Sequence, residues 1–338
     1  MKEASVEEQL CGFLGDLEES LHYDSGKTFD CDNILLCGVG GSAVSGDFAS
    51  DCCFTESVKP IRLMKYPDVP NWVGPRTLAI VSSYSGNTAE TVEMYRQVTE
   101  RGCTVVVITS GGMLGDLASA NGDHIMTLPK GMQPRHAIGF MIGYTLETIR
   151  MAGGPDLRDR ITGLMPSLRQ YRQAISEGDG CLAKEIAGFL MGNVPVICSD
   201  ASMRSVAFRW KTQINENSKF VAFCDYAPLF NEHSLDSWAQ TDRSNYALLV
   251  LIGCNDGMSD GTPYLEDIVS RMEGSSAKCR AVRLGGSSTL ENMFRAIILG
   301  DYVSINMARM RGIDPAEVRP VMQLKAKLAQ RNRSLQAS

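Results

Sequence analysis

The segment Ser83–Thr88, which reads Ser-Tyr-Ser-Gly-Asn-Thr, places three hydroxyl side chains and a glycine within six residues. It follows an apolar run, Leu78–Val81, that is typical of a buried strand. The residues after it have helical spacing, and Asn87 with Glu90 three positions later predicts a capping box with Asn87 as the N-cap. The sequence therefore predicts a strand, a tight polar loop and a helix start in succession.

The hydroxyls of Ser83, Ser85 and Thr88 suit an anionic ligand. Backbone N–H groups and the positive end of the helix dipole attract anions at such a helix start, and hydroxyls add donors without adding charge. The alternative is an ordinary polar loop before a well-capped helix. The density of hydroxyls at this place favours a phosphate site.

A second candidate loop follows the apolar run Ile34–Cys37 and contains Gly40 and Gly41 before Ser42. Glycines between a strand and a helix let a ligand approach the backbone closely. The loop only partly matches the dinucleotide fingerprint Gly-x-Gly-x-x-Gly, because Ala43 holds the final position. Parallel strands end at the same edge of a sheet, so both loops can face a single crevice.

The composition is that of a globular protein, with 338 residues, 44% hydrophobic content and a net charge of −6. The negative charge argues against binding to nucleic acid. No apolar run approaches the roughly 18 residues that span a bilayer, and the N-terminus lacks an apolar signal segment. We therefore expect a cytoplasmic protein with no membrane segment.

The chain contains 11 cysteines and 4 histidines. The cysteines have no C-x-x-C spacing, and several lie in apolar strands, as expected of small buried side chains in a reducing compartment. No combination of histidine, cysteine and carboxylate has the spacing of a metal site. We expect neither a metal ion nor another cofactor.

The chain contains two successive series in which apolar strands alternate with helices. This pattern predicts two doubly wound α/β domains with parallel sheets. The run Gly-Gly-Pro at 153–155 breaks the pattern after a long apolar helix at 138–151. We therefore expect an N-terminal domain of residues 1–153 and a C-terminal domain of residues 154–338. The second domain is expected to contain a strand at 220–223 and a last helix at 317–330.

Five separated pieces of the chain resemble the bifunctional phosphoglucose/phosphomannose isomerase family, whose members have two flavodoxin-like sugar isomerase (SIS) domains. The resemblance covers about residues 33 to 330. The serine loop is common to all SIS proteins, whereas the run Trp-Lys-Thr-Gln-Ile-Asn-Glu-Asn at 210–217 is more specific. The pieces are Gly38–Ser42, Ser83–Thr88, Pro134–Arg135, Arg209–Lys219 and Gly300–Ser304.

The resemblance implies a role for each matching side chain and no need for a metal or a nucleotide. Glu216 would be the general base, Arg135 would lie over C1 and C2 of the sugar, and His233 would open the sugar ring. The active site would be shared across the interface of a homodimer. The residues implied in substrate binding are Gly41, Ser42, Ser83, Ser85, Thr88 and Lys325.

The ring-opening loop departs from the family pattern, which is approximately Pro-Glu-x-Asn-His-Asn-Glu. The chain reads Pro-Leu-Phe-Asn-Glu-His-Ser from Pro228. An ungapped count puts the family histidine at Glu232 and leaves His233 one position late. Three alternatives remain: His233 acts after a small loop adjustment, Glu232 replaces it, or ring opening is impaired.

Aldose–ketose isomerisation explains why these residue types occur together. One carboxylate can remove the proton beside the carbonyl and return it to the neighbouring carbon through a cis-enediol. A guanidinium stays charged and can stabilise the enediolate oxygen. Taken without the resemblance, Glu216 fits a solvated carboxylate near a helix end, and Arg135 fits a local ion pair.

The sequence predicts an isomerase that interconverts glucose 6-phosphate and fructose 6-phosphate, with mannose 6-phosphate as a further candidate substrate. One alternative is an SIS protein that senses a sugar phosphate and regulates a partner, which the shifted His233 favours. Such regulators usually carry a helix-turn-helix domain, and none is recognisable in the chain. The other alternative is an isomerase of an amino or deoxy sugar phosphate.

Overall fold

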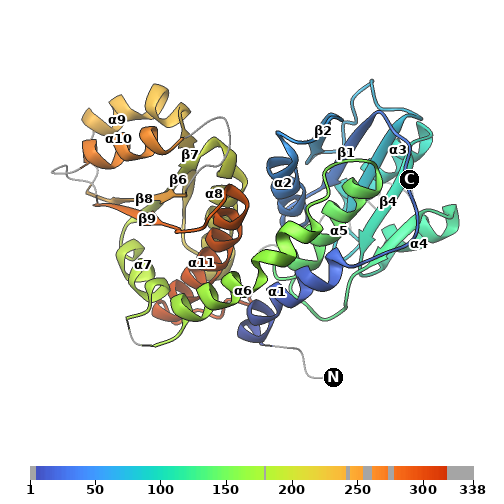
Figure 1. The fold of residues 1–338 in the computed structure, drawn as a ribbon. Helices are drawn as coiled ribbons and strands as arrows, with labels where there is room; N and C mark the ends of the chain where they lie inside the picture. The colour runs from blue at the N-terminus through green and yellow to red at the C-terminus, as the bar shows by residue number, and fades with distance from the viewer. Residues whose placement is uncertain (1–4, 179, 241–243, 254–260, 273–277, 318–338) are drawn as a thin grey trace, which may run out of the picture.

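The computed structural model describes residues 5–178, 180–240, 244–253, 261–272 and 278–317. Figure 1 shows two sheets, each with its own flanking helices, and a group of helices that lies between them. None of the described helices is long and apolar enough to cross a membrane.

The N-terminal sheet has five parallel strands in the order β2-β1-β3-β4-β5. Successive side chains face two different cores, so that Leu36 and Ile80 lie in one and Leu35 and Val81 in the other. Burial on both faces is the reason that these strands are continuously apolar. The strands are β1 (Asn33–Gly38), β2 (Ile61–Met64), β3 (Thr77–Ser82), β4 (Thr104–Thr109) and β5 (His124–Thr127).

Helices cover both faces of this sheet, with α1, α2 and α5 on one face and α3 and α4 on the other. The first helix starts with a complete capping box between Ser5 and Glu8. The long apolar helix predicted at 138–151 is confirmed. The helices are α1 (Val6–Leu21), α2 (Gly41–Cys53), α3 (Ala89–Glu100), α4 (Gly112–Asn121) and α5 (Ile138–Met151).

The C-terminal sheet has four parallel strands in the order β7-β6-β8-β9, which repeats the order of the first four strands of the other sheet. Its strands are β6 (Val194–Asp200), β7 (Phe223–Ala227), β8 (Tyr246–Ile252) and β9 (Lys278–Arg283). Its helices are α6 (Arg158–Ser176), α7 (Leu182–Leu190), η1 (Ala201–Met203), α8 (Arg204–Ser218), η2 (Phe230–Ser234), α9 (Leu235–Gln240), α10 (Thr262–Met272) and α11 (Thr289–Met310).

One continuous hydrophobic core joins the two sheets and includes residues of α1, α2, α5, α6, α7, α8 and α11. The rings of Phe48 in α2 and Phe294 in α11 lie 4.9 Å apart between centroids. The buried Trp210 of α8 donates from Nε1 to the carbonyl oxygen of Ala296 at 2.7 Å. A Cβ on Gly300 would lie only 2.6 Å from the Trp210 ring, so glycine is what lets α11 approach α8. Close packing therefore fixes α8, which carries much of the candidate site.

The predicted class of two doubly wound parallel α/β domains is confirmed, and the strand order is of the flavodoxin type. The division of the chain at residue 153 stays a prediction. The strand predicted at 220–223 is wrong, because Lys219 ends α8 in the left-handed region and β7 begins only at Phe223. The helix predicted at 317–330 lies outside the described residues apart from Glu317.

Candidate active site

The serine loop, residues 83–88, follows β3 and is shaped by two glycines. Gly86 has a φ of 64°, and a Cβ there would lie 1.7 Å from the carbonyl oxygen of Gly111. Gly112 has a φ of 69°, and a Cβ there would lie 2.3 Å from the carbonyl oxygen of Ser85. Only glycine fits at these contacts, so the loops after β3 and β4 pack backbone against backbone.

The hydroxyls of the two candidate phosphate loops lie close to one another. The Ser83 hydroxyl donates to that of Thr88 at 3.3 Å, and the Ser42 hydroxyl accepts from the Tyr84 N–H at 3.2 Å. Ser85 Oγ accepts from the Asn87 N–H at 3.3 Å. Because β1 and β3 are neighbours in the sheet, the loops that follow them lie side by side. That they share one ligand crevice stays a prediction, since neither Ser42 nor any of residues 83–88 lines the cleft between α2 and α8.

The prediction that Asn87 caps α3 is wrong. The N-cap of that helix is Thr88, which makes no side-chain capping bond. Asn87 Oδ1 instead accepts from the N–H of Met113, in the first turn of α4, at 3.0 Å. The serine loop is also held by Ser110, whose N–H and hydroxyl both donate to the Tyr84 carbonyl oxygen. The sequence signal for this contact is the pair of glycines, Gly111 and Gly112, directly after a strand, which is typical of close backbone packing.

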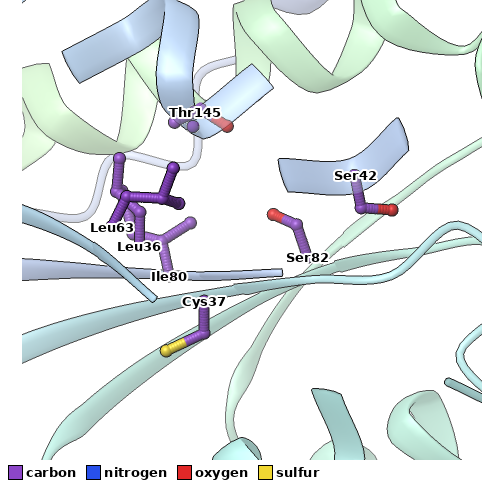
Figure 2. Close-up of a pocket in the computed structure, with 8 residues that line it drawn as sticks. Leu36, Cys37, Ser42, Leu63, Ile80, Ser82 and Thr145 are labelled. Carbon is purple, nitrogen blue, oxygen red and sulfur yellow. The ribbon is translucent and has the colours of Figure 1, made fainter. Parts of the chain in front are cut away.

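A small void lies beneath Ser42, between the sheet and helices α2 and α5 (Figure 2). The side chains of Leu36, Leu63 and Ile80 and the hydroxyls of Ser82 and Thr145 surround it. Its free volume is only about 10 Å³, which leaves room for one water molecule at most. It is therefore a packing void below the candidate phosphate loops.

A larger cleft, with a free volume of about 80 Å³, lies between α2 and α8. It joins the start of α2 to one face of α8 and to the loop that precedes α5. A Cβ on Gly41 would lie 3.5 Å from the Cα of Arg135, so the start of α2 directly adjoins the arginine. The residues that line the cleft are Gly40, Gly41, Ala43, Val44, Lys65, Arg135, Phe208, Arg209, Thr212, Gln213 and Glu216.

Arg135 is only 3% exposed, and two of its nitrogens are anchored. Nε donates to Oδ1 of Asn217 at 2.7 Å, and Nη2 donates to the carbonyl oxygen of Pro315 at 2.7 Å. Nη1 is held more loosely, 3.5 Å from Oε1 of Gln133 and 3.7 Å from Oε2 of Glu216. Burial lowers the pKa of Arg135 and the Glu216 carboxylate opposes this shift, so the group keeps its charge. Nη1 is thus the donor that a ligand in the cleft can use.

Glu216 lies in the last turn of α8, with a side chain that is 42% exposed. Its carboxylate contacts the Arg135 guanidinium and also lines the cleft. The structure therefore brings together Gly41, Arg135 and Glu216, and the Ser42–Tyr84 hydrogen bond connects this group to the serine loop.

A buried polar network supports this face of α8 from below. Arg209 Nη2 donates to Oδ2 of Asp301 at 2.7 Å and to the carbonyl oxygen of Arg135 at 3.2 Å. Gln213 donates to the other Asp301 oxygen at 3.0 Å. Burial raises the pKa of Asp301, and Arg209 and Gln213 counteract this shift. Arg209, Gln213 and Asp301 lie in segments that carry the family resemblance, but their spacing in the sequence does not predict this network.

Asn217 and Lys219 complete the site and were not predicted from the sequence. Asn217 is fully buried, and its amide nitrogen donates to Ser304 Oγ at 2.9 Å, which orients Oδ1 toward Arg135. Lys219 ends α8 with a φ of 53°, and its Nζ donates to the carbonyl oxygens of Glu216 and Pro315 at 2.6 and 3.2 Å. Burial lowers the pKa of Lys219, and the nearby Arg135 adds to this effect.

The remaining predicted residues do not join this group. His233 and Glu232 are exposed in η2, which follows β7, and within the described ranges neither lines the cleft nor contacts Arg135 or Glu216. Lys325 lies outside the described residues. Among the residues that the structure covers, no three His, Cys, Asp or Glu side chains are grouped as metal ligands.

Two family models match parts of the chain, one over β3 to β5 and the other over β6 to β9. Residues 65–152 match the SIS domain, and residues 181–328 match the bacterial phospho-glucose isomerase C-terminal SIS domain. These segments contain the serine loop and α8 respectively.

Relatives with known names are similar over nearly their whole length. The chain is 30% identical to a bifunctional phosphoglucose/phosphomannose isomerase of Thermoplasma acidophilum, covering 94% of this chain and 96% of the relative. An enzyme of the same name from Aquifex aeolicus is 30% identical, with coverages of 87% and 90%. In structure, the fold is similar to a hypothetical protein from Thermus thermophilus, with a TM-score of 0.72, 15% identity and coverages of 96% and 90%. With two SIS-type sheets and this degree of identity along the chain, the protein belongs to the bifunctional phosphoglucose/phosphomannose isomerase family.

Proposed function

We propose that the protein is an aldose–ketose isomerase that interconverts glucose 6-phosphate and fructose 6-phosphate and takes mannose 6-phosphate as a second aldose. Membership of the family supports this activity. The observation that carries the proposal is the pair of Glu216 and Arg135, whose charged groups lie 3.7 Å apart at the wall of one cleft. The proposal places the reaction in the cytoplasm.

Glu216 is the acid–base group in this proposal. Its carboxylate removes the proton from C2 of the aldose, which leaves an enediolate with its negative charge on O1. The proton of the C2 hydroxyl passes to O1, and the Glu216 carboxyl group returns its own proton to C1, which gives the ketose. A partly exposed carboxylate can reach a ligand without rearrangement.

Arg135 stabilises the negative charge that develops on the substrate oxygens. Asn217 and Pro315 hold Nε and Nη2, so the guanidinium is oriented before the substrate binds. Nη1 is left to donate to the enediolate oxygen. A fixed donor in a partly enclosed cleft needs no reorganisation during the reaction, which is the main source of electrostatic catalysis.

The phosphate group provides binding energy at a distance from the reacting carbons. In the proposal, Ser42, Ser83, Ser85 and Thr88 donate hydroxyls, and Gly41 offers a backbone N–H at the start of α2. This cradle carries no charge of its own, so specificity for phosphate comes from the number and direction of its donors.

Ring opening requires a further group, and we propose that a second copy of the chain brings His233 to the cleft. In this chain His233 lies away from Arg135 and Glu216, as a shared site in a homodimer requires. Glu232 is the alternative group, and Lys325 is assigned to the pocket from the family pattern.

A subunit-mixing experiment tests the shared site. Mixing equal amounts of Glu216→Gln and His233→Ala protein should restore about a quarter of the activity, since half of the dimers are mixed and each has one intact site. No recovery after subunit exchange would contradict the shared site.

The test of the activity is the conversion of fructose 6-phosphate into aldose phosphates by the purified protein. Glu216→Gln should lower kcat by about 10²- to 10⁴-fold, the typical contribution of a general acid–base group, with little change in KM. Glu177→Gln, at the end of α6, is the matched control and should keep full activity. A Glu216→Gln variant that is as active as the parent would overturn the assignment of the base.

The same assay distinguishes the alternatives. Tight binding of fructose 6-phosphate with no turnover would indicate a sugar-phosphate sensor. Faster turnover of an amino or deoxy sugar phosphate than of fructose 6-phosphate, measured over a panel of substrates, would indicate another phosphosugar isomerase.

A further inference from the structure

The catalytic arginine of the proposed function lies in the loop between β5 and α5, not in a helix or strand. Within this loop, the N–H groups of His136 and Ala137 donate to the carbonyl oxygen of Gln133 at 2.8 and 3.2 Å. These bonds make a local turn around Arg135 but do not connect it to the rest of the N-terminal half. Contacts from outside the loop must therefore hold it in place.

The side chain of Gln9, from the first helix, provides such a contact. It is 6% exposed, and its Oε1 accepts from the N–H of Gln133 at 2.9 Å. The same oxygen lies 3.2 Å from Nδ1 of His136. Gln133 and His136 flank Arg135 on both sides, so one amide oxygen holds the two ends of the turn.

The chemistry of His136 fixes the direction of the second bond. Its ring is 2% exposed, and its Nε2 has no hydrogen-bond partner among the described residues. Burial lowers the pKa of His136 to about 3, and the charges of Arg135 and Arg209 add to the effect, so the ring is neutral near neutral pH. The backbone N–H of Gln133 can only donate, so the atom of the Gln9 side chain that faces it must be the amide oxygen. The same oxygen faces Nδ1 of His136. His136 must then carry its proton on Nδ1 and donate it to Gln9.

We propose that Gln9 is a positioning residue for catalysis, because it holds the turn that carries Arg135 through the backbone of Gln133 and the Nδ1–H of His136. The inference rests on the proposed function. It assigns a role to α1, which lies outside both segments that match the family models. The helix is well fixed for this role, since Phe13, Leu14 and Leu17 are buried in the core shared with α5.

The kinetic test compares two replacements of Gln9. Gln9→Met keeps the length of the side chain but removes the acceptor, and kcat should fall by about 10- to 100-fold because small misplacements of a catalytic group are costly. The KM for fructose 6-phosphate should change less than about 3-fold, because the phosphate loops are untouched. Gln9→Glu keeps an acceptor oxygen for both donors and should recover most of the lost kcat near neutral pH.

Two control variants separate positioning from a general loosening of the helix. Leu10→Ala removes a buried side chain from the same turn of α1 and should lower stability without a comparable loss of kcat. Gln173→Met, which removes an exposed hydrogen bond on α6, should change neither the stability nor kcat. An unchanged kcat in Gln9→Met, or an equal loss of kcat in Leu10→Ala, would overturn the proposal.

A spectroscopic test does not depend on activity. Long-range ¹⁵N–¹H correlation spectra of the 4 histidines should show His136 as a neutral ring protonated on Nδ1, and this signature should change in Gln9→Met. If the parent protein has no isomerase activity but shows this signature, the proposed function fails and the contact stands. A ring protonated on Nε2 in the parent would refute the contact whatever the activity.

Discussion

The two halves of the chain share a strand order, but they differ in how the ends of α2 and α8 are used. These two helices follow the first strand of each sheet. In the N-terminal half, β1 leads to α2, whose N-cap is Gly40 with a φ of 62° and no side-chain cap. In the C-terminal half, β6 leads through η1 to α8. There Asp200 Oδ1 accepts from the N–H of Ser202 at 2.7 Å, and Asp51 Oδ2 accepts from the N–H of Ser205 at 3.0 Å.

Under the proposed function, this difference assigns the phosphate to the N-terminal half. The start of α2 has no side-chain cap, whereas carboxylates accept from the N–H of Ser202 in η1 and from that of Ser205 in the first turn of α8. These carboxylates would also repel a second anion. The C-terminal half contributes instead from the other end of its helix, through Glu216, Asn217 and Lys219. The two sheets thus have the same strand order, and the residues at the helix ends distinguish them. In the proposal, the start of α2 binds the phosphate and the end of α8 carries the acid–base group.

Among the substitutions that compare the two halves, Arg135→Lys should have the largest effect, because this arginine of the N-terminal half is anchored by residues of the C-terminal half. Lysine keeps the charge but cannot reach Asn217, Pro315 and the substrate together. We expect kcat to fall by about 10²-fold, the typical cost of removing one preoriented donor. Steady-state kinetics provide the measurement, with Arg160→Lys, at an exposed ion pair with Glu56, as the matched control. A loss below about 3-fold would contradict the role of the anchored guanidinium.

A smaller effect, on the KM for fructose 6-phosphate, is expected when a serine at the start of α2 is replaced and compared with a serine just before α8. Ser42→Ala should raise the KM for fructose 6-phosphate by about 10-fold, since a hydrogen bond to a charged group contributes roughly 1.5 to 3 kcal/mol. Ser202→Ala, in η1 before α8, should leave KM unchanged. Equal effects of the two substitutions would remove the distinction between the halves.

The carboxylate at the start of α8 should matter for stability and not for substrate binding. Asp51→Ala leaves the N–H of the buried Ser205 without its acceptor and breaks the ion pair with Arg204. We expect a loss of about 1 to 3 kcal/mol in the free energy of unfolding, measured by urea denaturation. Asp51→Asn keeps an acceptor and should lose less. A changed KM with unchanged stability would argue against this assignment.

The smallest effect concerns pH. The folded protein keeps His136 neutral with a pKa of about 3, whereas the unfolded chain binds a proton near the ordinary value of 6.5. The contribution of this group to stability is therefore complete above pH 6.5 and is lost as the pH falls toward 3. Its slope is at most about 1.4 kcal/mol per pH unit.

Denaturation curves between pH 7 and pH 5 would measure this slope, and His136→Gln should make it flatter. His22→Gln, which replaces an exposed histidine at the end of α1, should leave the slope as in the parent. An identical slope in both variants would show that another group is responsible.

Local patterns in the sequence were sufficient for the elements and for several site residues. Apolar runs and helical spacing predicted the alternating fold, and the cluster of hydroxyls between a strand and a helix predicted the serine loop. Glu216 and Arg135 were named from the family resemblance, and the structure places them in one cleft. The prediction for Asn87 was wrong, because its side chain accepts from the first turn of α4 and not from α3, the helix that follows it in the sequence.

The residues that support the site could not be found in this way. Asn217 and Gln9 are ordinary polar residues in amphipathic helices, and nothing in their local spacing distinguishes them from solvated side chains. Their partners are 82 and 124 residues away in sequence. Such contacts exist only after the shared core has fixed α1, α8 and α11 against the N-terminal sheet.

By itself, the sequence determined which segments form strands and helices and where hydroxyls and glycines gather, since propensity, periodicity and capping act over a few residues. Only the tertiary structure decided which helix start stays open and which is occupied by carboxylates. It also decided that a buried amide would hold the guanidinium that faces Glu216. A side chain gains such a role from groups that folding brings within hydrogen-bond distance while it removes water, and neither condition exists before the chain is folded.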